Sequence, residues 1–309
     1  MESFKIGIAQ YSPVHMNLGA TLKKVEQIFQ SLEDDIDLIV FGETWLSGYP
    51  GWLDSCRDVG LWDHGPMKEV YLKFRQNSVK VPGAEVKVLA DLAKKYNTGI
   101  CIGVNEKVEE GTGNGTIYNS LLTINENGEL VNHHSKLMHT FTEKLVYGTG
   151  DGNGLKSVDV KGIKVGGLIC WEHWMPLARQ TMHNAGEILH VAAWPRVHEM
   201  LGIASRHYAF EGRCFVVAVG QIMKVSDIPE NLETPEDLQA NPDEMLLNGG
   251  SCVIGPDGKF IVEPIFDKET IIYATINPED VYKERMTLDT SGHYQRKDVF
   301  SFEVNNRRI

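Results

Sequence analysis

The sequence predicts a single α/β domain built as a sandwich of sheets and helices. Three observations lead to this fold class. Short β-rich runs alternate with amphipathic helical segments near both ends of the chain, a strand-rich stretch lies between them, and no linker-like tract interrupts the 309 residues. Because 42% of the residues are apolar, a chain of this length can bury a substantial core, so we expect one domain over residues 1–309.

The first elements are predicted to form a β-α-β unit. The runs FKIGIAQY and DLIVFGE are typical of strands, and between them apolar residues from Leu22 to Leu32 fall near helical spacing. A second helix is predicted over residues 83–97, and the apolar strand GICIGV follows it. The runs TIYNSLLTI and LVNHHSKL then flank the turn NENGE, which predicts a hairpin.

The second half of the chain continues this alternation. KSVDV and IKVGGLIC flank a turn at residues 161–162, and helices are predicted over residues 176–185 and 197–213. The runs EILHVAAW and FVVAVGQI follow as strands. The acidic stretch 226–244 contains three prolines and no periodicity, so we expect a surface loop there and leave a lid role open.

Composition excludes several classes of protein. The chain has 30 basic and 42 acidic residues, a formal net charge of −12, so its average surface would repel a phosphate backbone and we expect no nucleic-acid partner. The N-terminus does not resemble a secretory signal, and no apolar run approaches the ~18 residues of a membrane span. Five scattered cysteines without a C-x-x-C pair argue against a disulfide framework and a zinc ribbon. We therefore expect a soluble cytoplasmic protein with reduced thiols and no membrane partner.

Two glycine-rich segments, Gly111–Gly115 and Gly148–Gly154, raise the question of a nucleotide site. A phosphate cradle needs a strand before the glycines and a helix after them. Both segments lead into predicted strands instead. We interpret them as tight turns and expect no dinucleotide cofactor.

Cys170 lies at the end of an apolar strand and is followed at once by the polar residues Glu172 and His173. Three roles are open from the residues alone: a buried core thiol, a metal ligand, or a nucleophile. A core role suits the cysteines at positions 101, 214 and 252. A metal site would need further ligands from His183 or His190, at no recognised spacing. Pro176 marks the start of a helix, and a thiol near a helix N-terminus would have a lowered pKa.

Two further charged positions stand out. Glu43 ends an apolar strand, where an unpaired carboxylate is costly, so it needs a partner or a chemical role. Lys136 follows an extended run and precedes Glu143 by seven residues. Taken alone, a Lys and a Glu at this distance are typical of a solvated ion pair.

Taken together, these segments resemble the nitrilases of the carbon-nitrogen hydrolase superfamily, in particular the bacterial branch. Members of this superfamily combine a Glu, a Lys and a Cys in that chain order. The matching segments here are FGETWLSGYPGW, HHSKLMHTFTEKLVYGTGDG and GGLICWEHWMPLARQ, with further similarity as far as SGHYQRKDVF near the C-terminus. The run Cys-Trp-Glu resembles nitrilases rather than the amidase branches.

The resemblance implies a hydrolase that converts an organic nitrile to the carboxylic acid and ammonia, without metal or organic cofactor. Cys170 would be the nucleophile and Glu43 the general base. Lys136 and the backbone N–H of Trp171 would stabilise the developing negative charge, and Glu143 would keep Lys136 charged and oriented.

The resemblance also implies a four-layer α-β-β-α sandwich that associates into dimers or larger spiral oligomers. The tail from about Met286 would lie at a subunit interface. Trp171 and Trp194 adjoin the ends of strands that carry the site, and with Tyr49 they are the aromatic residues expected at the substrate.

Two positions depart from the family pattern: Ser135 replaces the usual Arg, and His139 replaces the usual Pro. These changes bear on the level and pH optimum of activity rather than on the reaction class. Three alternatives remain open: a nitrile- or cyanide-hydrating relative that releases amide, an amidase or carbamoylase of the same superfamily, and an inactive oligomeric scaffold.

Overall fold

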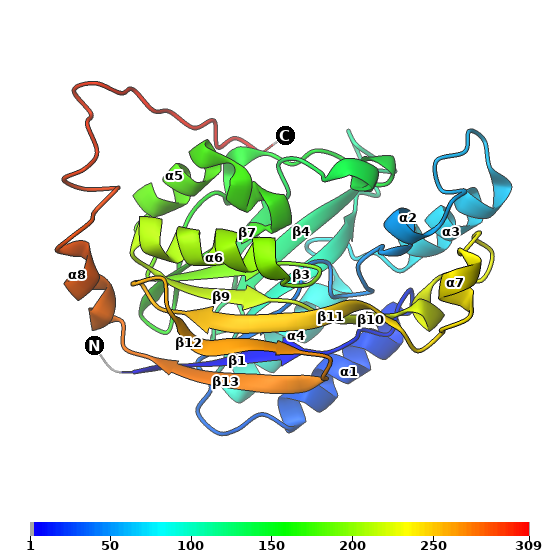
Figure 1. Cartoon of the computed structure of the whole chain (residues 1–309), viewed down its shortest axis with the longest axis horizontal. Coiled ribbons are helices and arrows are strands. Elements are labelled where there is room, and N and C mark those ends of the chain that lie inside the picture. Colours follow the sequence, from blue (N-terminus) through cyan, green and yellow to red (C-terminus); the bar gives the residue numbers. More distant parts are fainter. Residues whose placement is uncertain (1–2, 309) are drawn as a thin grey trace.

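The computed structural model describes residues 3–308 as two β-sheets covered by helices (Figure 1). Residues 1, 2 and 309 of the predicted domain lie outside the described residues. The first sheet has six strands in the order β13-β1-β2-β3-β4-β5. Their bounds are β1 (Phe4–Gln10), β2 (Leu38–Phe41), β3 (Gly99–Lys107), β4 (Ile117–Ile124), β5 (Leu130–Ser135) and β13 (Thr270–Ile276).

The second sheet has seven strands, six of them in the order β10-β11-β9-β8-β7-β6, and the seventh, β12, pairs with β11. Their bounds are β6 (Val158–Val160), β7 (Ile163–Ile169), β8 (Leu189–Ala193), β9 (Phe215–Val219), β10 (Ile222–Lys224), β11 (Met245–Ile254) and β12 (Phe260–Phe266). The central strands β7, β8 and β9 run parallel, and their residues are almost all buried, as expected for parallel strands covered on both faces.

The two sheets pack face to face and share one apolar core. Ile8 and Leu38 of the first sheet belong to the same buried cluster as Leu168, Val191 and Val217 of the second. Side chains from the two inner faces interdigitate in such a sandwich. Residues from both halves of the chain therefore meet in the interior between the two sheets.

Helices cover the outer faces of both sheets. The first sheet is covered by α1 (Leu18–Gln30) and α4 (Ala84–Tyr96), whose buried residues Phe29 and Leu89 pack with Ile39 of β2. The second is covered by α5 (Pro176–Asn184) and α6 (Glu199–Gly212) on the opposite side of the molecule (Figure 1). The predicted α-β-β-α layering is confirmed.

The local predictions for the strands are also confirmed. β1 and β2 pair in parallel across α1, with Ile6 opposite Leu38, so the β-α-β unit is present. β4 and β5 form the expected antiparallel hairpin, as do β6 and β7. Each hairpin ends directly before one of the polar residues expected at the strand ends, and α4 leads the chain into β3.

The remaining helical elements are short, apart from α3. They are α2 (Trp52–Ser55), α3 (Gly65–Gln76), α7 (Glu236–Gln239), α8 (Glu279–Arg285), and the 3₁₀ helices η1 (Phe141–Leu145), η2 (Gly152–Gly154), η3 (Cys170–Trp174) and η4 (Val225–Asp227). The acidic stretch 226–244, expected to be a loop, thus holds the single turn α7. No helix in the described range 3–308 has the length and apolar character needed to cross a membrane.

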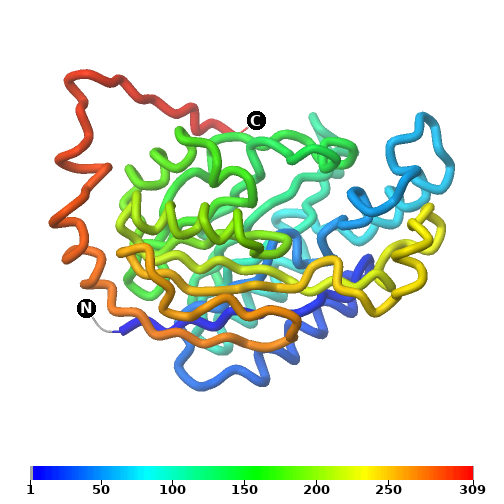
Figure 2. The backbone as a smooth tube through the Cα atoms, viewed as in Figure 1, coloured from blue at the N-terminus to red at the C-terminus, as the bar shows by residue number. Residues whose placement is uncertain are grey.

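The C-terminal tail runs along the outside of the molecule after α8 and passes α5 (Figure 2). Gln295 donates to Asn184 at the end of α5, and the backbone oxygen of Asn306 accepts from Asn153 in η2. The tail has no strand or helix among its described residues after Arg285. These contacts hold it against its own chain.

Candidate active site

The structure brings together the four residues predicted to carry the chemistry. Glu43 follows β2, Lys136 follows β5, Glu143 lies in η1, and Cys170 follows β7 as the first residue of η3. All four are buried, with at most 4% of any one exposed. A carboxylate oxygen of Glu43, one of Glu143 and the sulfur of Cys170 lie within 4.8 Å of one another. The site therefore joins two residues that follow strands of the first sheet, and Glu143 of η1, to a thiol that follows a strand of the second.

Lys136 connects the two carboxylates. Its Nζ donates to Glu43 Oε1 at 2.7 Å and to both oxygens of Glu143 at 2.7 and 3.0 Å. Burial alone would lower the pKa of Lys136, but the neighbouring Cys170, Glu43 and Glu143 raise it well above its usual range. The Lys136–Glu143 pair is therefore buried and ionised, and the solvated surface pair is excluded.

Glu43 has one bound oxygen and one free oxygen. Its Oε1 also accepts from Asn119 Nδ2 at 2.7 Å, whereas Oε2 is buried without a hydrogen-bond partner in the described part of the chain. Burial raises the pKa of Glu43 to about 7, against the opposing attraction of Lys136. A carboxylate with a free oxygen and a pKa near neutrality is suited to accept a proton.

The pKa of Glu143 is shifted in the opposite direction to that of Glu43. It accepts from Tyr49 Oη at 2.8 Å and from the Thr140 backbone N–H at 2.9 Å, besides Lys136. Burial would raise its pKa, but Lys136, His139 and Thr140 together lower the pKa to about 2. When their surroundings give two carboxylates different pKa values, the two groups take different chemical roles. Glu143 stays an anion that holds Lys136, and Glu43 is the residue that can exchange a proton.

Cys170 does not have the lowered pKa that a nearby helix N-terminus would give. Burial raises the pKa of its thiol well above the usual range, and the Glu43 carboxylate raises it further. The physical reason is position: α5 begins only at Pro176, and the sulfur lies in a closed space beside two carboxylates. The thiol therefore stays protonated at rest, so a base must remove its proton as it attacks.

The three acidic or thiol side chains of this cluster have the donor atoms of a metal site. However, the Lys136 ammonium lies 2.7 Å from an oxygen of each carboxylate and supplies the positive charge that a cation would bring. His183 and His190, considered as metal ligands from the sequence, hydrogen-bond to Glu211 and Glu187 instead.

Glu172 is a positioning residue whose contacts the sequence did not reveal. It accepts from the backbone N–H groups of Ile169 and Leu137, both at 2.7 Å, and from His134 Nε2 at 2.8 Å. Ile169 precedes Cys170, and Leu137 follows Lys136. One buried carboxylate thus fixes the loop of the thiol to the loop of the ammonium, which explains why the acid follows Cys-Trp in this motif.

The two departures from the family pattern have separate surroundings. His139 donates from Nε2 to the Gly148 carbonyl at 2.6 Å, stacks on Tyr147, and has its Nδ1 3.7 Å from Glu143 Oε2. Near Ser135 the tail provides a cation, because Arg308 donates to the His133 carbonyl at 2.6 Å and lies 3.5 Å from Ser135 Oγ. The positive charge missing at position 135 is thus present from another part of the chain.

A pocket of about 430 Å³ leads to the sulfur of Cys170. Tyr49 and Trp171 line it as predicted, and Trp171 is 55% exposed. Its other lining residues are Gly51, Asp54, Ser55, Thr140, Glu143, Pro195, Arg196, His198, Leu201, Glu244, Met245, Leu246 and Leu247. The lining combines apolar side chains with the charged residues Asp54, Arg196 and Glu244.

Trp194, expected at the substrate, does not line this pocket. It is fully buried, stacks on His173 with ring centroids 4.6 Å apart, and donates from Nε1 to Ser205 of α6 at 3.2 Å. The side chain at the end of β8 therefore faces α6, and the next residues, Pro195 and Arg196, reach the pocket instead.

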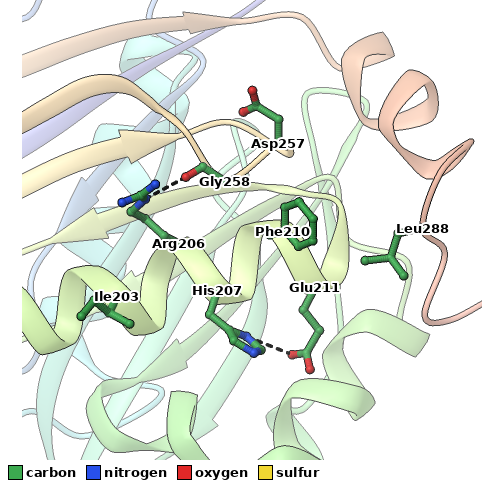
Figure 3. A pocket seen from close by; sticks show the side chains of 8 residues that line it. All are labelled: Ile203, Arg206, His207, Phe210, Glu211, Asp257, Gly258 and Leu288. Carbon is green, nitrogen blue, oxygen red and sulfur yellow. Dashed lines mark hydrogen bonds and ion pairs between the residues drawn. The ribbon is translucent and has the colours of Figure 1, made fainter.

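A second hollow, of about 540 Å³, lies on the outer face of α6. Figure 3 shows its lining, with Arg206, His207, Phe210 and Glu211 from α6 and Leu288 from the tail. It contains none of the four residues of the chemical site. Glu211 connects it to the buried histidines behind Cys170, because His183 Nε2 lies 3.2 Å from Glu211 Oε2.

Comparison with known proteins identifies the class. Residues 5–286 match the model of the carbon-nitrogen hydrolase family. In the solved structures, a carbon-nitrogen hydrolase from Helicobacter pylori G27 has the same fold, with a TM-score of 0.70 at 18% identity over 96% of this chain and 97% of that one. The chain belongs to the carbon-nitrogen hydrolase family.

Relatives that are named as nitrilases narrow the assignment within the carbon-nitrogen hydrolase family. The chain is 34% identical to "Nitrilase 2" of an unknown prokaryotic organism, over 97% of this chain and 92% of that protein. It is 31% identical to an aliphatic nitrilase of Sinorhizobium fredii (strain HH103), over 99% and 96% of the two chains. Within its superfamily the chain is a nitrilase, a hydrolase that acts on carbon–nitrogen bonds.

Proposed function

We propose that this nitrilase converts an organic nitrile to the carboxylic acid and ammonia through a covalent thioimidate on Cys170. The observation that carries the proposal is the free, buried Oε2 of Glu43, because the carboxylate lies within 4.8 Å of the sulfur and Lys136 lies against its other oxygen. A base, a nucleophile and a fixed cation are thus in one closed site.

In the first step, the sulfur of Cys170 bonds to the nitrile carbon and its proton passes to Glu43. One π-bond of the nitrile breaks, and its electron pair moves to nitrogen. The Lys136 ammonium and the Trp171 backbone N–H stabilise this charge until the nitrogen takes the proton from Glu43. The product of the step is a neutral thioimidate.

In the later steps, two water molecules are consumed. The first water adds to the thioimidate carbon with Glu43 as base, and the carbon–nitrogen bond then breaks to release ammonia and leave a thioester. The second water attacks the thioester, the carbon–sulfur bond breaks, and the acid leaves as the thiol is restored. Departure of sulfur in place of ammonia would release an amide.

The test is a panel of aliphatic, aromatic and arylacetic nitriles with acid, amide and ammonia all quantified. We expect acid and ammonia in equal amounts from at least one class of nitrile. The matched amides should be poor substrates. Turnover of amides without turnover of nitriles would instead indicate an amidase, and amide as the sole product would indicate a hydrating enzyme.

The pH dependence follows from Glu43. Because Glu43 must be ionised to take the proton of Cys170, and its pKa is about 7, we expect kcat/KM to rise with pH and level off above about 7. The Asn119→Leu variant removes a hydrogen bond that lowers the pKa of Glu43, so its profile should shift to higher pH. Initial rates on one nitrile check both, and a profile that falls across neutrality would contradict the role of Glu43.

The Glu143→Gln substitution tests the anion that holds Lys136. It keeps the shape of the side chain and removes the charge, so we expect kcat and kcat/KM to fall together, by about 10²- to 10³-fold. An exposed ion pair would be worth at most ~1 kcal/mol and would leave turnover nearly intact. Steady-state kinetics on a folded variant is the measurement. An unchanged kcat would remove Glu143 from the site.

Self-association is also part of the proposal. Apolar side chains on the outer helices and η3 are exposed, among them Trp174 (41%), Leu177 (68%), Met200 (53%) and Ile203 (48%). The elements that carry these side chains contact one another, and apolar side chains exposed on neighbouring elements are typical of an interface. We expect a dimer or a larger oligomer, with the tail from Met286 contributing to the contact. Multi-angle light scattering at assay concentration checks this, and an active monomer would contradict it.

The proposed compartment is the cytoplasm. All five cysteines are free in the structure. A reducing compartment keeps such a thiol available.

A further inference from the structure

A buried chain of histidines and a carboxylate lies behind the nucleophile, and the steps above give it no role. Glu187, His190 and His173 are each at most 1% exposed. His190 Nδ1 lies 2.8 Å from Glu187 Oε2, and His190 Nε2 lies 3.0 Å from His173 Nε2. His173 Nδ1 lies 2.7 Å from the backbone oxygen of Cys170. The chain therefore ends on the nucleophile's own peptide group.

The groups at the two ends fix the direction of these hydrogen bonds. A carbonyl only accepts, so His173 Nδ1 donates to the Cys170 oxygen. Burial and the neighbouring His190 lower the pKa of His173 to about 3, so the ring is neutral and its Nε2 accepts from His190. Burial would raise the pKa of Glu187, but His190 and His183 lower it to about 2, so the carboxylate accepts as well. His190 thus lies between two acceptors, Glu187 Oε2 at its Nδ1 and His173 Nε2 at its Nε2.

The surrounding residues are shaped to hold the Glu187 carboxylate. The Tyr208 hydroxyl donates to Oε1, and His183 Nδ1 lies 3.6 Å from the same oxygen. A methyl group at Gly166, in the strand that leads to Cys170, would overlap the carboxylate. The strand thus has no side chain at the point where the acid needs space.

We propose that Glu187, His190 and His173 form a relay that positions and polarises the peptide group between Cys170 and Trp171. The oxygen of this peptide accepts from His173, and its N–H is the donor that the proposed mechanism directs to the nitrile nitrogen. Chains of hydrogen bonds polarise one another, so a donor on the oxygen strengthens the N–H on the other side. The inference rests on the proposed function.

Because of the backbone conformation at Cys170, the peptide group between Cys170 and Trp171 must be held in place by its neighbours. Its φ is 51°, in the left-handed region that residues other than glycine rarely occupy. A peptide plane in this region keeps its orientation only when the surroundings fix it. His173 acts on the oxygen of that plane, and Glu172 accepts from Ile169 on the preceding side.

The outer end of the relay reaches the surface. His183 lies 3.2 Å from Glu211, which accepts from Arg179 Nε at 2.7 Å and lines the hollow on α6 (Figure 3). A series of ion pairs and hydrogen bonds thus extends from Arg179 to the backbone oxygen of Cys170. If these groups had only a structural role, each would need only to pair its charge or its hydrogen bonds with a neighbour.

The relay is tested with three variants on the best nitrile of the panel. His173→Leu removes the donor to Cys170, whereas His173→Asn places an amide N–H near the position of Nδ1 and cuts the link to His190. His190→Gln keeps a donor toward His173 without the hydrogen bond to Glu187. We expect kcat to fall about 10²-fold in His173→Leu and about tenfold in the other two, with KM changed by less than about twofold.

Alkylation of Cys170 by iodoacetamide is the second readout. This reaction builds no charge on a substrate nitrogen, so its rate should stay within about twofold of the wild type in all three variants. His64→Gln, at a histidine that pairs with Asp58 outside the relay, is the matched control and should keep wild-type kcat. If His173→Leu does not fold, His173→Asn and His190→Gln supply the comparison.

Wild-type kcat in the folded histidine variants would overturn the relay and leave the proposed function intact. Equal losses of turnover and of alkylation would also overturn it, because they would indicate general distortion of the site. A wild-type protein that turns over no nitrile would overturn the proposed function, and the relay with it.

Discussion

Replacing Cys170 by alanine is expected to abolish nitrile turnover, with a loss of about 10⁴-fold or more in kcat. The thiol is the nucleophile that attacks the nitrile carbon in the proposed mechanism, and an alanine methyl cannot form the thioimidate. Because the sulfur is small and lies in a site held by Glu172 and Lys136, the variant should keep its fold. Turnover is measured with acid and ammonia quantified separately.

Cys101→Ala is the matched control for this substitution. Cys101 is also fully buried at a strand, and it accepts a weak hydrogen bond from Thr123. Burial raises the pKa of Cys101 to about 12, so this thiol is inert. We expect the control to retain activity, and intact mass spectrometry should show a covalent adduct on the wild type and on Cys101→Ala but not on Cys170→Ala. Activity retained by Cys170→Ala would refute the mechanism.

Replacing Lys136 by methionine is expected to remove activity and to lower the free energy of unfolding by about 3–5 kcal/mol, because it leaves buried carboxylates without their counter-charge. Glu43 and Glu143 are 0% and 2% exposed, and both depend on the same ammonium. Urea unfolding followed by fluorescence measures the stability, and single-turnover kinetics measures the chemistry.

Two further variants test whether the effect comes from the charge of Lys136 in this buried site. Lys136→Met combined with Glu143→Gln removes one charge of each sign, so it should recover part of the lost stability and none of the activity. Lys87→Met removes an exposed lysine paired with Asp91 on α4 and should change the stability by less than about 0.5 kcal/mol. A Lys136→Met protein as stable as the wild type would show that the carboxylates do not depend on the ammonium.

The strands and the main site residues could be predicted because their signals are local. Apolar runs that end abruptly in Glu43 and in Cys170 mark the ends of buried strands, and the order of Glu, Lys and Cys resembles a known family. By contrast, α3 was not predicted: only Val70 and Phe74 of its residues are buried, so its apolar periodicity is weak.

Other features depend on contacts that no local pattern carries. Asn119 reaches Glu43 across 76 residues of sequence, and Glu172 reaches Leu137 across 35. The position of Trp194 outside the pocket lining could not be predicted either, because adjacency to a strand end does not say which way a side chain turns. The lowered pKa expected for Cys170 was wrong because burial beside carboxylates outweighs a helix that begins six residues later.

The pairing of β13 with β1 has a consequence for synthesis of the protein. β1 is the first strand to leave the ribosome, but its outer edge is covered only by residues 270–276, with Phe4 opposite Ile276. Until then, an apolar strand presents an unpaired edge, which is a template for pairing with other chains. The first sheet can therefore be completed only after about nine-tenths of the chain has been made, and a nascent or truncated chain is the form most exposed to aggregation.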